Sequence, residues 1–105
     1  MTQQDMNICA HRDYLAADEL LNQQWERTAA AMRERDAQWG DSFDERPGYF
    51  EVLLESQRAW LQYRDAQCAV EGYWARGGSL EPLLVSGCLT LLTRRRTEEL
   101  REIAD

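Results

Sequence analysis

The stretch QRAWLQYRDAQC, Gln57 to Cys68, decides the fold, because it has the spacing of an α-helix and carries two polar residues on the face that should be buried. Continued back to Phe50 in steps of three or four residues, this face comprises Phe50, Leu53, Leu54, Gln57, Trp60, Leu61, Arg64 and Cys68. Apolar residues at this spacing are typical of a helix that packs one side against other helices. Gln57 and Arg64 interrupt the face, so the sequence predicts polar groups inside a helical interface.

Helical spacing also runs through the chain on both sides of this segment, and no strand pattern competes with it. The first predicted helix spans about 3–38, with the stripe Met6, Ala10, Tyr14, Ala17, Leu21, Trp25, Thr28 and Met32. The second spans about 49–75. The third spans about 80–104, with the stripe Val85, Leu89, Leu92, Arg96, Leu100 and Ile103.

Two breaks separate the predicted helices. GDSFDERPG, Gly40 to Gly48, collects glycine, proline and acidic residues, and RGGS, Arg76 to Ser79, offers glycines for a helix stop with Ser79 as N-cap of the next helix. Short connections between long helices imply antiparallel neighbours. We therefore expect one all-α domain, residues 1–105, folded as an elongated antiparallel three-helix bundle. At about 1.5 Å per residue the first helix is roughly 50 Å long, so its ends should project beyond the others.

The charge balance limits the kinds of partner that the protein attracts. Its 105 residues include 19 acidic and 12 basic side chains, all of the latter arginine, and the net charge is −7. This excess of negative charge disfavours nucleic acids and anionic membranes and favours a basic partner. No run of 18 apolar residues is present, so no membrane-spanning segment is expected. The N-terminus lacks the pattern of a signal peptide, which fits a cytosolic start and a mature fragment without its leader equally well.

Cys9, Cys68 and Cys88 leave three alternatives open. An odd number of cysteines suggests one disulfide and a spare thiol, and the chain reversal between Cys68 and Cys88 makes these two the best candidate pair. Closing a loop of about 20 residues in this way adds roughly 3 kcal/mol in the chain-entropy model. Three free thiols in a cytosolic protein are the second alternative. A zinc site that includes His11 is the third, but its spacings do not match the common zinc motifs, so neither a metal nor a cofactor is expected.

Arg96 falls on the stripe of the third helix as Arg64 falls on that of the second. An arginine inside a helix interface needs acceptors, because an unpaired buried charge costs several kcal/mol. The expected polar layer, in which Asp18 pairs with one or both arginines, comprises Asp18, Asn22, Gln57, Arg64, Asp65 and Arg96. Such a layer fixes the register of helices more than it adds stability.

These polar residues do not form a recognisable catalytic set. His11 is the only histidine and lies near the N-terminus, so no general base for neutral pH accompanies the carboxylates and arginines. The sequence shows no serine–histidine or cysteine–histidine arrangement and no phosphate-binding glycine loop. It therefore predicts a protein that is not an enzyme.

The aromatic residues fall into two groups. Tyr14, Trp25 and Trp60 lie on the predicted inward stripes and should belong to the core. The residues near helix ends or in the first connection are Trp39, Phe43, Tyr49, Tyr73 and Trp74. We expect these to pack the ends of the bundle; the alternative is that they anchor a partner, as aromatic side chains do at interface hot spots.

Five separated motifs occur in a specific order along the chain. They are MNICA at 6–10, AADELLNQQW at 16–25, QRAWLQYRDAQC at 57–68, GGS at 77–79 and CLTLLTRRRTEEL at 88–100. Together they resemble the lysozyme inhibitor LprI-like family, formerly a domain of unknown function. The resemblance covers almost the whole chain, and the loop around 40–48 is its least characteristic part.

The resemblance implies a helical domain exported across the inner membrane, either periplasmic, lipid-anchored or secreted, where disulfides form. It implies that Cys68 and Cys88 are paired and that Thr93 belongs with the polar layer. Many relatives carry a further cysteine just upstream of the one that corresponds to Cys9, and this chain has none there. Cys9 is then an unpaired thiol or forms an intermolecular bond, so a monomer and a dimer both fit.

The resemblance also implies a non-catalytic binding protein whose partner is a basic protein such as lysozyme. The candidate contact is the loop that presents Trp74, Arg76 and Ser79. The alternative is a structural or stress-related interaction module of the cell envelope without activity on lysozyme.

Overall fold

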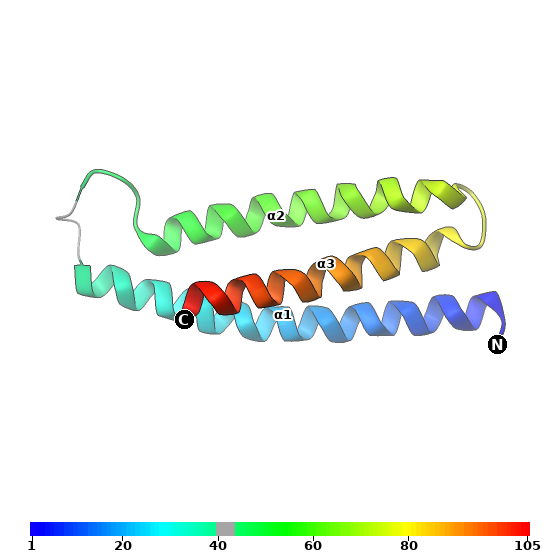
Figure 1. Ribbon diagram of the computed structural model, residues 1–105, viewed down its shortest axis with the longest axis horizontal. Helices are drawn as coiled ribbons and strands as arrows, with labels where there is room; N and C mark the ends of the chain where they lie inside the picture. Colours follow the sequence, from blue (N-terminus) through cyan, green and yellow to red (C-terminus); the bar gives the residue numbers. More distant parts are fainter. Residues whose placement is uncertain (40–43) are drawn as a thin grey trace.

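The computed structural model describes residues 1–39 and 44–105. Helix α1 spans Gln3–Trp39, α2 spans Tyr49–Gly72, the short 3₁₀ helix η1 spans Tyr73–Ala75, and α3 spans Glu81–Ala104 (Figure 1). The described residues contain no strand, so the all-α prediction is confirmed. One boundary differs, because the predicted second helix, 49–75, ends as an α-helix at Gly72 and its last turn is the tighter η1.

The helices form an elongated antiparallel bundle whose Cα atoms extend over 58 × 21 × 13 Å. Helix α3 packs most extensively against α1 and less against α2, and α1 and α2 contact each other least. Accordingly, α3 lies between the other two in Figure 1, and its C-terminal end stops well short of the connection between α1 and α2. Helix α1 therefore projects beyond α3, as its length leads one to expect.

A side chain of α1 caps the N-terminus of α2. Asp36 accepts hydrogen bonds from the backbone N–H of Tyr49 to Oδ1 at 2.7 Å and from that of Phe50 to Oδ2 at 3.1 Å. The first N–H groups of a helix lack partners within it, and a carboxylate there also complements the positive end of the helix dipole. Gly48 permits this approach, since a Cβ atom at that position would lie 2.7 Å from Oδ1 of Asp36.

The turn between α2 and α3 confirms one expectation and corrects another. Gly77 has a φ of +82°, the left-handed conformation expected of a helix stop. The prediction that Ser79 caps α3 is wrong: Leu80 holds the N-cap position, is already in right-handed helical conformation, and makes no side-chain cap. The carbonyl of Ser79 instead accepts a hydrogen bond from the side-chain amide of Asn7 at 2.9 Å. Oε1 of Glu81 accepts one from the N–H of Gly77 at 3.0 Å.

The interior contains polar and apolar residues in similar numbers. The buried apolar residues are Ala17, Leu21, Ala29, Met32, Leu53, Cys68, Cys88 and Leu100. The buried polar residues are Gln24, Thr28, Gln57, Arg64, Ser86, Thr90, Thr93, Arg96 and Thr97. Within the described part of the chain, every buried side-chain nitrogen and oxygen atom has a hydrogen-bond partner. Thr28, for example, donates from Oγ1 to the carbonyl of Leu100 at 2.8 Å and so joins α1 to α3.

The predicted stripes match the buried and half-buried positions of all three helices, with one exception at the end of α3. Ile103 was expected to face inward and is exposed, because α3 ends there and the bundle has only two helices beyond it. Near the opposite end, α2 and α3 approach each other closely. A Cβ atom on Gly72 would lie 2.5 Å from Cγ2 of Val85, so a residue without a side chain is needed at this contact.

Candidate functional site

Arg96 of α3 is buried and all three of its guanidinium nitrogens are bonded. Nε donates to Oε1 of Gln57 at 2.9 Å, Nη2 to Oγ of Ser56 at 3.0 Å, and Nη1 to Oε1 of Glu99 at 3.0 Å. The side chain of Glu99 is 58% exposed, so the charge of Arg96 is balanced by a carboxylate that remains in water. This arrangement lowers the cost of burial, because only one member of the ion pair loses its hydration.

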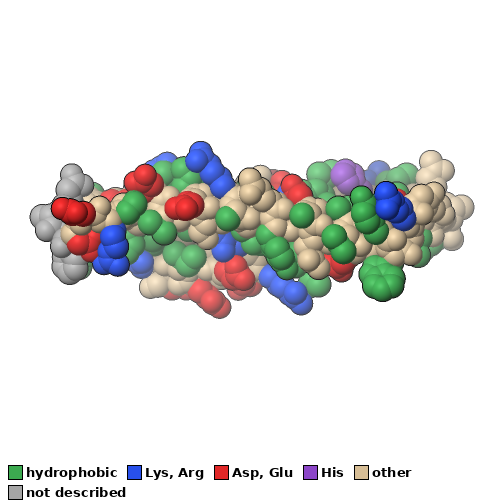
Figure 2. All heavy atoms as spheres, turned by 90° about the horizontal axis from the view of Figure 1, so that it is seen from above, with side chains coloured by type: hydrophobic (Ala, Val, Ile, Leu, Met, Phe, Trp, Pro, Cys, Tyr) green, Lys and Arg blue, Asp and Glu red, His purple; other side chains and the backbone are tan. Residues whose placement is uncertain are grey.

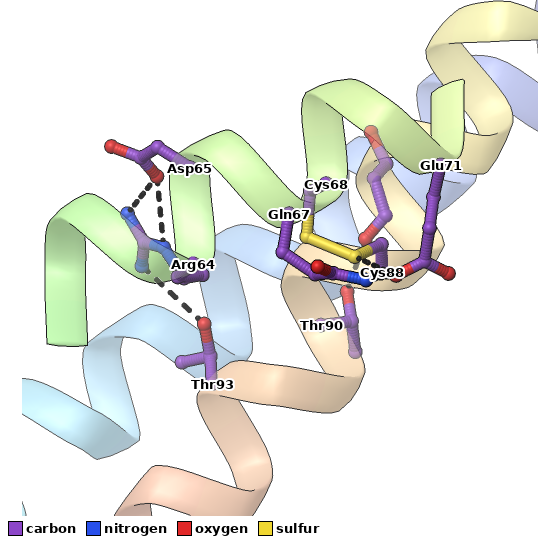
Figure 3. The surroundings of a disulfide bond; sticks show 9 residues. Arg64, Asp65, Gln67, Cys68, Glu71, Cys88, Thr90 and Thr93 are labelled. Atoms are coloured by element: carbon purple, nitrogen blue, oxygen red, sulfur yellow. Dashed lines mark hydrogen bonds and ion pairs between the residues drawn. A yellow bond between two sulfur atoms is a disulfide. The ribbon is translucent and has the colours of Figure 1, made fainter. Parts of the chain in front are cut away.

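Arg64 of α2 is equally buried and reaches side chains of all three helices. Nε and Nη2 both lie 3.0 Å from Oδ1 of Asp65, the next residue on α2. Nη1 donates to Oγ1 of the fully buried Thr93 of α3 at 3.4 Å (Figure 3). The same nitrogen lies 3.8 Å from Oδ1 of Asp18 of α1. Arg64 therefore joins the three helices at one level of the bundle, and the contacts of Arg96 with Gln57 and Ser56 join α3 to α2 about two helical turns away along α2.

The indole of Trp60 lies close to both arginines. Its ring centroid is 5.3 Å from Cζ of Arg64 and 5.9 Å from Cζ of Arg96. The ring of Tyr14, on α1, lies 5.5 Å from the same Cζ atom of Arg64. Aromatic faces attract cations, so these rings stabilise charges that the half-exposed carboxylates balance only in part.

The structure places the predicted members of the polar layer around Arg64 and Arg96, with one correction. Asn22 is exposed and lies outside the layer, because it follows the inward-facing Leu21 by about 100° around the helix. Asp18 lies near Arg64 alone of the two arginines, which is one of the expected alternatives, and Arg96 pairs with Glu99, a partner that was not predicted. The spacing of Arg96 and Glu99, three residues apart on one helix, is a signal that could have identified this pair.

The disulfide between Cys68 and Cys88 joins α2 to α3, as expected, with Cα atoms 5.4 Å apart (Figure 3). Oε2 of Glu71 lies 3.0 Å from Sγ of Cys88. Because a disulfide sulfur carries no hydrogen, this is a close sulfur–oxygen contact and not a hydrogen bond. Nε2 of Gln67 donates to the same carboxylate oxygen at 3.4 Å. A negatively charged group therefore stands directly beside one sulfur of the disulfide.

The disulfide excludes the zinc alternative and the alternative of three free thiols, because it uses two of the three cysteines. Cys9 is exposed on α1 and carries a free thiol. Among the described residues, no group of three or more His, Cys, Asp or Glu side chains could hold a metal ion. No helix in this part of the chain is long and apolar enough to cross a membrane.

The loop after α2 exposes an aromatic and a basic side chain at the end of the bundle. Trp74 is 88% exposed, and Cζ of Arg76 lies 4.5 Å from the ring centroid of Tyr73. Ser79 is exposed, and its carbonyl is bonded to Asn7 near the N-terminus of α1. The backbone of the loop is thus attached to α1, while Trp74 and Arg76 point outward.

The aromatic residues at helix ends do not pack the bundle as tightly as expected. Trp39, Tyr49 and Tyr73 are each about half exposed, and Phe43 lies outside the described residues. An open depression of about 1400 Å³ lies at the end where α3 is absent, and the apolar residues that line it include Met32, Phe50, Leu53 and Ile103. Arg33 covers the ring of Phe50, with Cζ 4.1 Å from its centroid.

An exposed ion pair stands in the connection at this same end. Side-chain and backbone hydrogen bonds from Arg46 hold the pKa of Asp44 below its ordinary value, and the side-chain hydrogen bond to Asp44 raises the pKa of Arg46. Both groups are in water, so the pair has little effect on stability. Arg46 is therefore an exposed arginine with a purely local role, at the opposite end of the molecule from Arg76.

Comparison with known proteins shows which proteins are similar to this chain in sequence, which the geometry alone does not. The family model described as lysozyme inhibitor LprI matches residues 1–100 of the chain. An uncharacterized protein of Rhizobium meliloti (strain 1021) is 50% identical over 105 residues, which cover 100% of this chain and 76% of the relative. No solved structure matches significantly. The matched residues include both cysteines of the disulfide and all members of the polar layer.

Proposed function

The chain belongs to the lysozyme inhibitor LprI family, and on that basis we propose that it is an extracytoplasmic, non-catalytic protein that binds and inhibits a lysozyme. The observation that carries this proposal is the loop after α2, on which Trp74 is 88% exposed and Arg76 is close by. Tryptophan and arginine are the side chains that most often dominate the energy of a protein interface. A tryptophan this exposed leaves a large apolar surface in water until a partner covers it.

The loop is held in place before any partner binds. Its backbone is bonded to Asn7 of α1 and to the side chain of Glu81 of α3, and the Cys68–Cys88 disulfide joins the helices on either side of it. A loop that is already ordered loses little conformational entropy on binding. This supports a role for Trp74 and Arg76 as presented contact residues.

The chemistry of the two side chains suits the cleft of a glycosidase. Such clefts contain a pair of catalytic carboxyl groups flanking the scissile bond. The guanidinium of Arg76 is a planar, permanently charged donor that pairs well with a carboxylate. We infer that Arg76 approaches these carboxylates and that Trp74 packs against the wall of the cleft, so that substrate is excluded.

Long-range electrostatics favours the same partner. The net charge of −7 attracts a basic lysozyme and raises the rate of encounter. Electrostatic steering acts mainly on the association rate and weakens as the salt concentration rises. The contacts that Arg76 and Trp74 make once they are covered by the lysozyme set the dissociation rate. The two contributions can therefore be separated by varying the ionic strength.

The proposed location outside the cytoplasm is supported by the disulfide. Disulfides persist in the periplasm and in secreted proteins and are rare in the cytosol, where thiols are kept reduced. Cys68 is fully buried and Cys88 nearly so, so this bond is a structural element of the fold.

The test is the muramidase activity of a basic lysozyme titrated with the protein at low and at moderate salt. We expect stoichiometric inhibition that survives moderate salt. Trp74→Ala and Arg76→Ala should each weaken inhibition by roughly thirtyfold or more, since hot-spot residues contribute about 2 kcal/mol or more.

Arg46→Ala is the matched control, because it removes the same charge from an exposed arginine at the other end of the molecule. Leu91→Ala is the corresponding control for Trp74→Ala, because it truncates a half-exposed apolar side chain on α3. Inhibition confined to low salt, with equal effects of Arg76→Ala and Arg46→Ala, would reduce the interaction to charge pairing. No inhibition at either salt would contradict the proposal and favour an envelope interaction module with a different partner.

A further inference from the structure

The outer face of α2 carries a row of exposed small, apolar and aromatic side chains, of which only Ser56, at the edge of this face, also contacts α3, through its hydrogen bond from Arg96. This row, the α2 seam, comprises Ser56, Ala59, Tyr63, Ala66, Val70 and Tyr73. Tyr63, Val70 and Tyr73 are 55%, 60% and 52% exposed. Figure 2 looks onto the α2 side of the molecule and shows patches of hydrophobic side chains along most of its length, with acidic and basic side chains between and beside them.

The spacing of the α2 seam is that of a coiled-coil interface. Its members follow one another at alternating steps of three and four residues, which is the pattern of the core positions of a heptad repeat. Tyr73 continues this face beyond the last α-helical residue, because its φ of −65° and ψ of −15° are still helical. A solvated helix face has no need of this periodicity, so the pattern points to a helix of another chain.

The order of side-chain sizes along the seam selects the partner. The residues at its N-terminal end, Ser56 and Ala59, are small, and those at its C-terminal end, Val70 and Tyr73, are large. We propose that a second copy of this chain packs its own α2 seam against the first in the antiparallel direction. Reversal of the helix then places a large residue opposite a small one in every layer.

The layers of this pairing can be stated residue by residue. Tyr63 of one copy lies opposite Ala66 of the other, Val70 opposite Ala59, and Tyr73 opposite Ser56, and the same contacts recur in reverse across the twofold axis. Large side chains facing small ones interdigitate without voids or clashes. A parallel pair would place Tyr63 against Tyr63 and Ala59 against Ala59, which alternates clash and cavity. The antiparallel register is therefore the one that the sizes favour.

Charge supports the same occupant. Each copy carries a net charge of −7, and 30% of all residues are charged, so most pairings of two copies would bring like charges together. The α2 seam contains no charged residue, and Gln62, Gln67 and Ala69 beside it are also uncharged; Glu55 is the one carboxylate next to its N-terminal end, and the antiparallel register places it opposite the uncharged Trp74. Two copies can meet along this strip without placing carboxylates opposite one another.

The area available predicts a weak, reversible dimer. Exposed aromatic side chains contribute roughly 100 Å² each when half of their 150–250 Å² is uncovered, so the seam as a whole offers about 500 Å² per copy. A pair would then bury about 1,000 Å², at the lower edge of specific interfaces. We therefore expect a dissociation constant in the micromolar range rather than an obligate dimer.

The test is the mass of the protein by sedimentation equilibrium from about 1 μM to about 1 mM, which brackets a micromolar constant. The Cys9→Ser background removes thiol oxidation while leaving the Cys68–Cys88 disulfide intact. We expect a monomer–dimer equilibrium in this background. Ala66→Arg places a charge in the middle of the seam and should keep the protein monomeric over the whole range. Because Ala66 is exposed, the Ala66→Arg variant should fold normally and give the same far-ultraviolet circular dichroism spectrum as the parent protein.

Leu91→Arg is the control, since it adds the same side chain at a half-exposed apolar position of α3, and it should leave the dimer unchanged. Combining Tyr63→Glu with Ala66→Arg tests the register: unlike charges then face each other in the antiparallel pair, so dimerisation should return in part. Failure of this rescue would exclude the antiparallel register. A parent protein that stays monomeric at all concentrations, or an Ala66→Arg variant that dimerises as well as the parent, would overturn the proposal. The readout is mass alone, so the result does not depend on whether lysozyme is inhibited.

Discussion

Arg96 of α3 donates a hydrogen bond from Nε to Oε1 of Gln57 of α2, 2.9 Å away, inside the bundle. Both residues interrupt stripes that are otherwise apolar. Sliding one helix past the other by a single residue, about 1.5 Å, would break this bond and leave two buried polar groups without partners. The pair therefore sets the axial position of α3 relative to α2.

Gln57→Leu tests this role. The substitution keeps the volume but removes the acceptor of Arg96, and an unsatisfied buried donor costs roughly 1–3 kcal/mol, so the free energy of unfolding should fall by that amount. Chemical denaturation measures the change. Gln23→Leu, at an exposed position of α1, is the control and should alter stability by less than about 0.5 kcal/mol. Equal effects of the two substitutions would mean that the bond does not stabilise the fold.

Gly72→Ala should destabilise the protein, because the added Cβ would lie 2.5 Å from Cγ2 of Val85. Overpacking of this kind costs roughly 1–3 kcal/mol. Gly87→Ala is the matched control: apart from the adjacent residues and backbone of its own helix, nothing lies within 4 Å of the added Cβ. Alanine is also the better helix former, so this substitution should raise stability by about 0.5–1 kcal/mol. The melting temperatures should therefore move in opposite directions. Adding Val85→Ala should restore part of the loss in Gly72→Ala.

Asp36→Ala should remove the cap of α2 and lower the free energy of unfolding by about 1 kcal/mol, as the loss of an N-cap side chain does. Asp36→Asn should cost less, because an amide oxygen still accepts one of the two backbone hydrogen bonds. Glu34→Ala, an exposed carboxylate two residues earlier on α1, controls for the change of charge. If Glu34→Ala is as destabilising as Asp36→Ala, net charge and not capping is responsible.

Glu71→Gln should speed the reduction of the Cys68–Cys88 disulfide by a small anionic thiolate. The carboxylate of Glu71 stands 3.0 Å from Sγ of Cys88, and a repulsion of about 1 kcal/mol between like charges in water corresponds to roughly a fivefold lower rate. Glu55→Gln makes the same change of charge elsewhere on α2 and should leave the rate unchanged. Appearance of free thiol under limiting reductant measures both rates, and identical rates for the parent and Glu71→Gln would exclude a protective role.

Much of the fold follows from residue spacing alone, because three long segments keep one face apolar at the period of a helix. The same spacing identified Gln57, Arg64 and Arg96 as buried polar residues, since they fall on those faces. It could not identify Ser56 as a partner of Arg96, because Ser56 is exposed and only the packing of α3 brings a guanidinium to it. Asn22 was misplaced for a related reason: a residue beside a stripe turns inward or outward according to a rotation of the helix that spacing does not determine.

The turn between α2 and α3 also shows which features of a helix end cannot be predicted from the sequence. Its glycines indicated the reversal and the left-handed residue correctly. The start of α3 could not be predicted in the same way. It depends on the helical backbone conformation of Leu80 and on the hydrogen bond from the N–H of Gly77 to the side chain of Glu81, and residue preferences for helix ends reveal neither. Trp74 and Arg76 could be singled out by residue type, but their exposure depends on the path of the chain through η1 and the turn after it, which residue type does not reveal.

Because the disulfide lies near one end of the bundle, partial unfolding should begin at the other end. Beside the α2–α3 turn, a covalent bond and the close approach of Gly72 and Val85 hold the helices together. At the far end, where α3 is absent, α2 is attached through the cap from Asp36 and the side chains around an open depression. Partial unfolding begins where the fewest contacts must break, so backbone amides near Tyr49 should exchange with deuterium well before those near Cys68. A protease would gain its first access at the end that lacks the disulfide. A cut between α1 and α2 would leave α2 and α3 joined by their turn and by the disulfide, and α1 would then be held to them by packing alone.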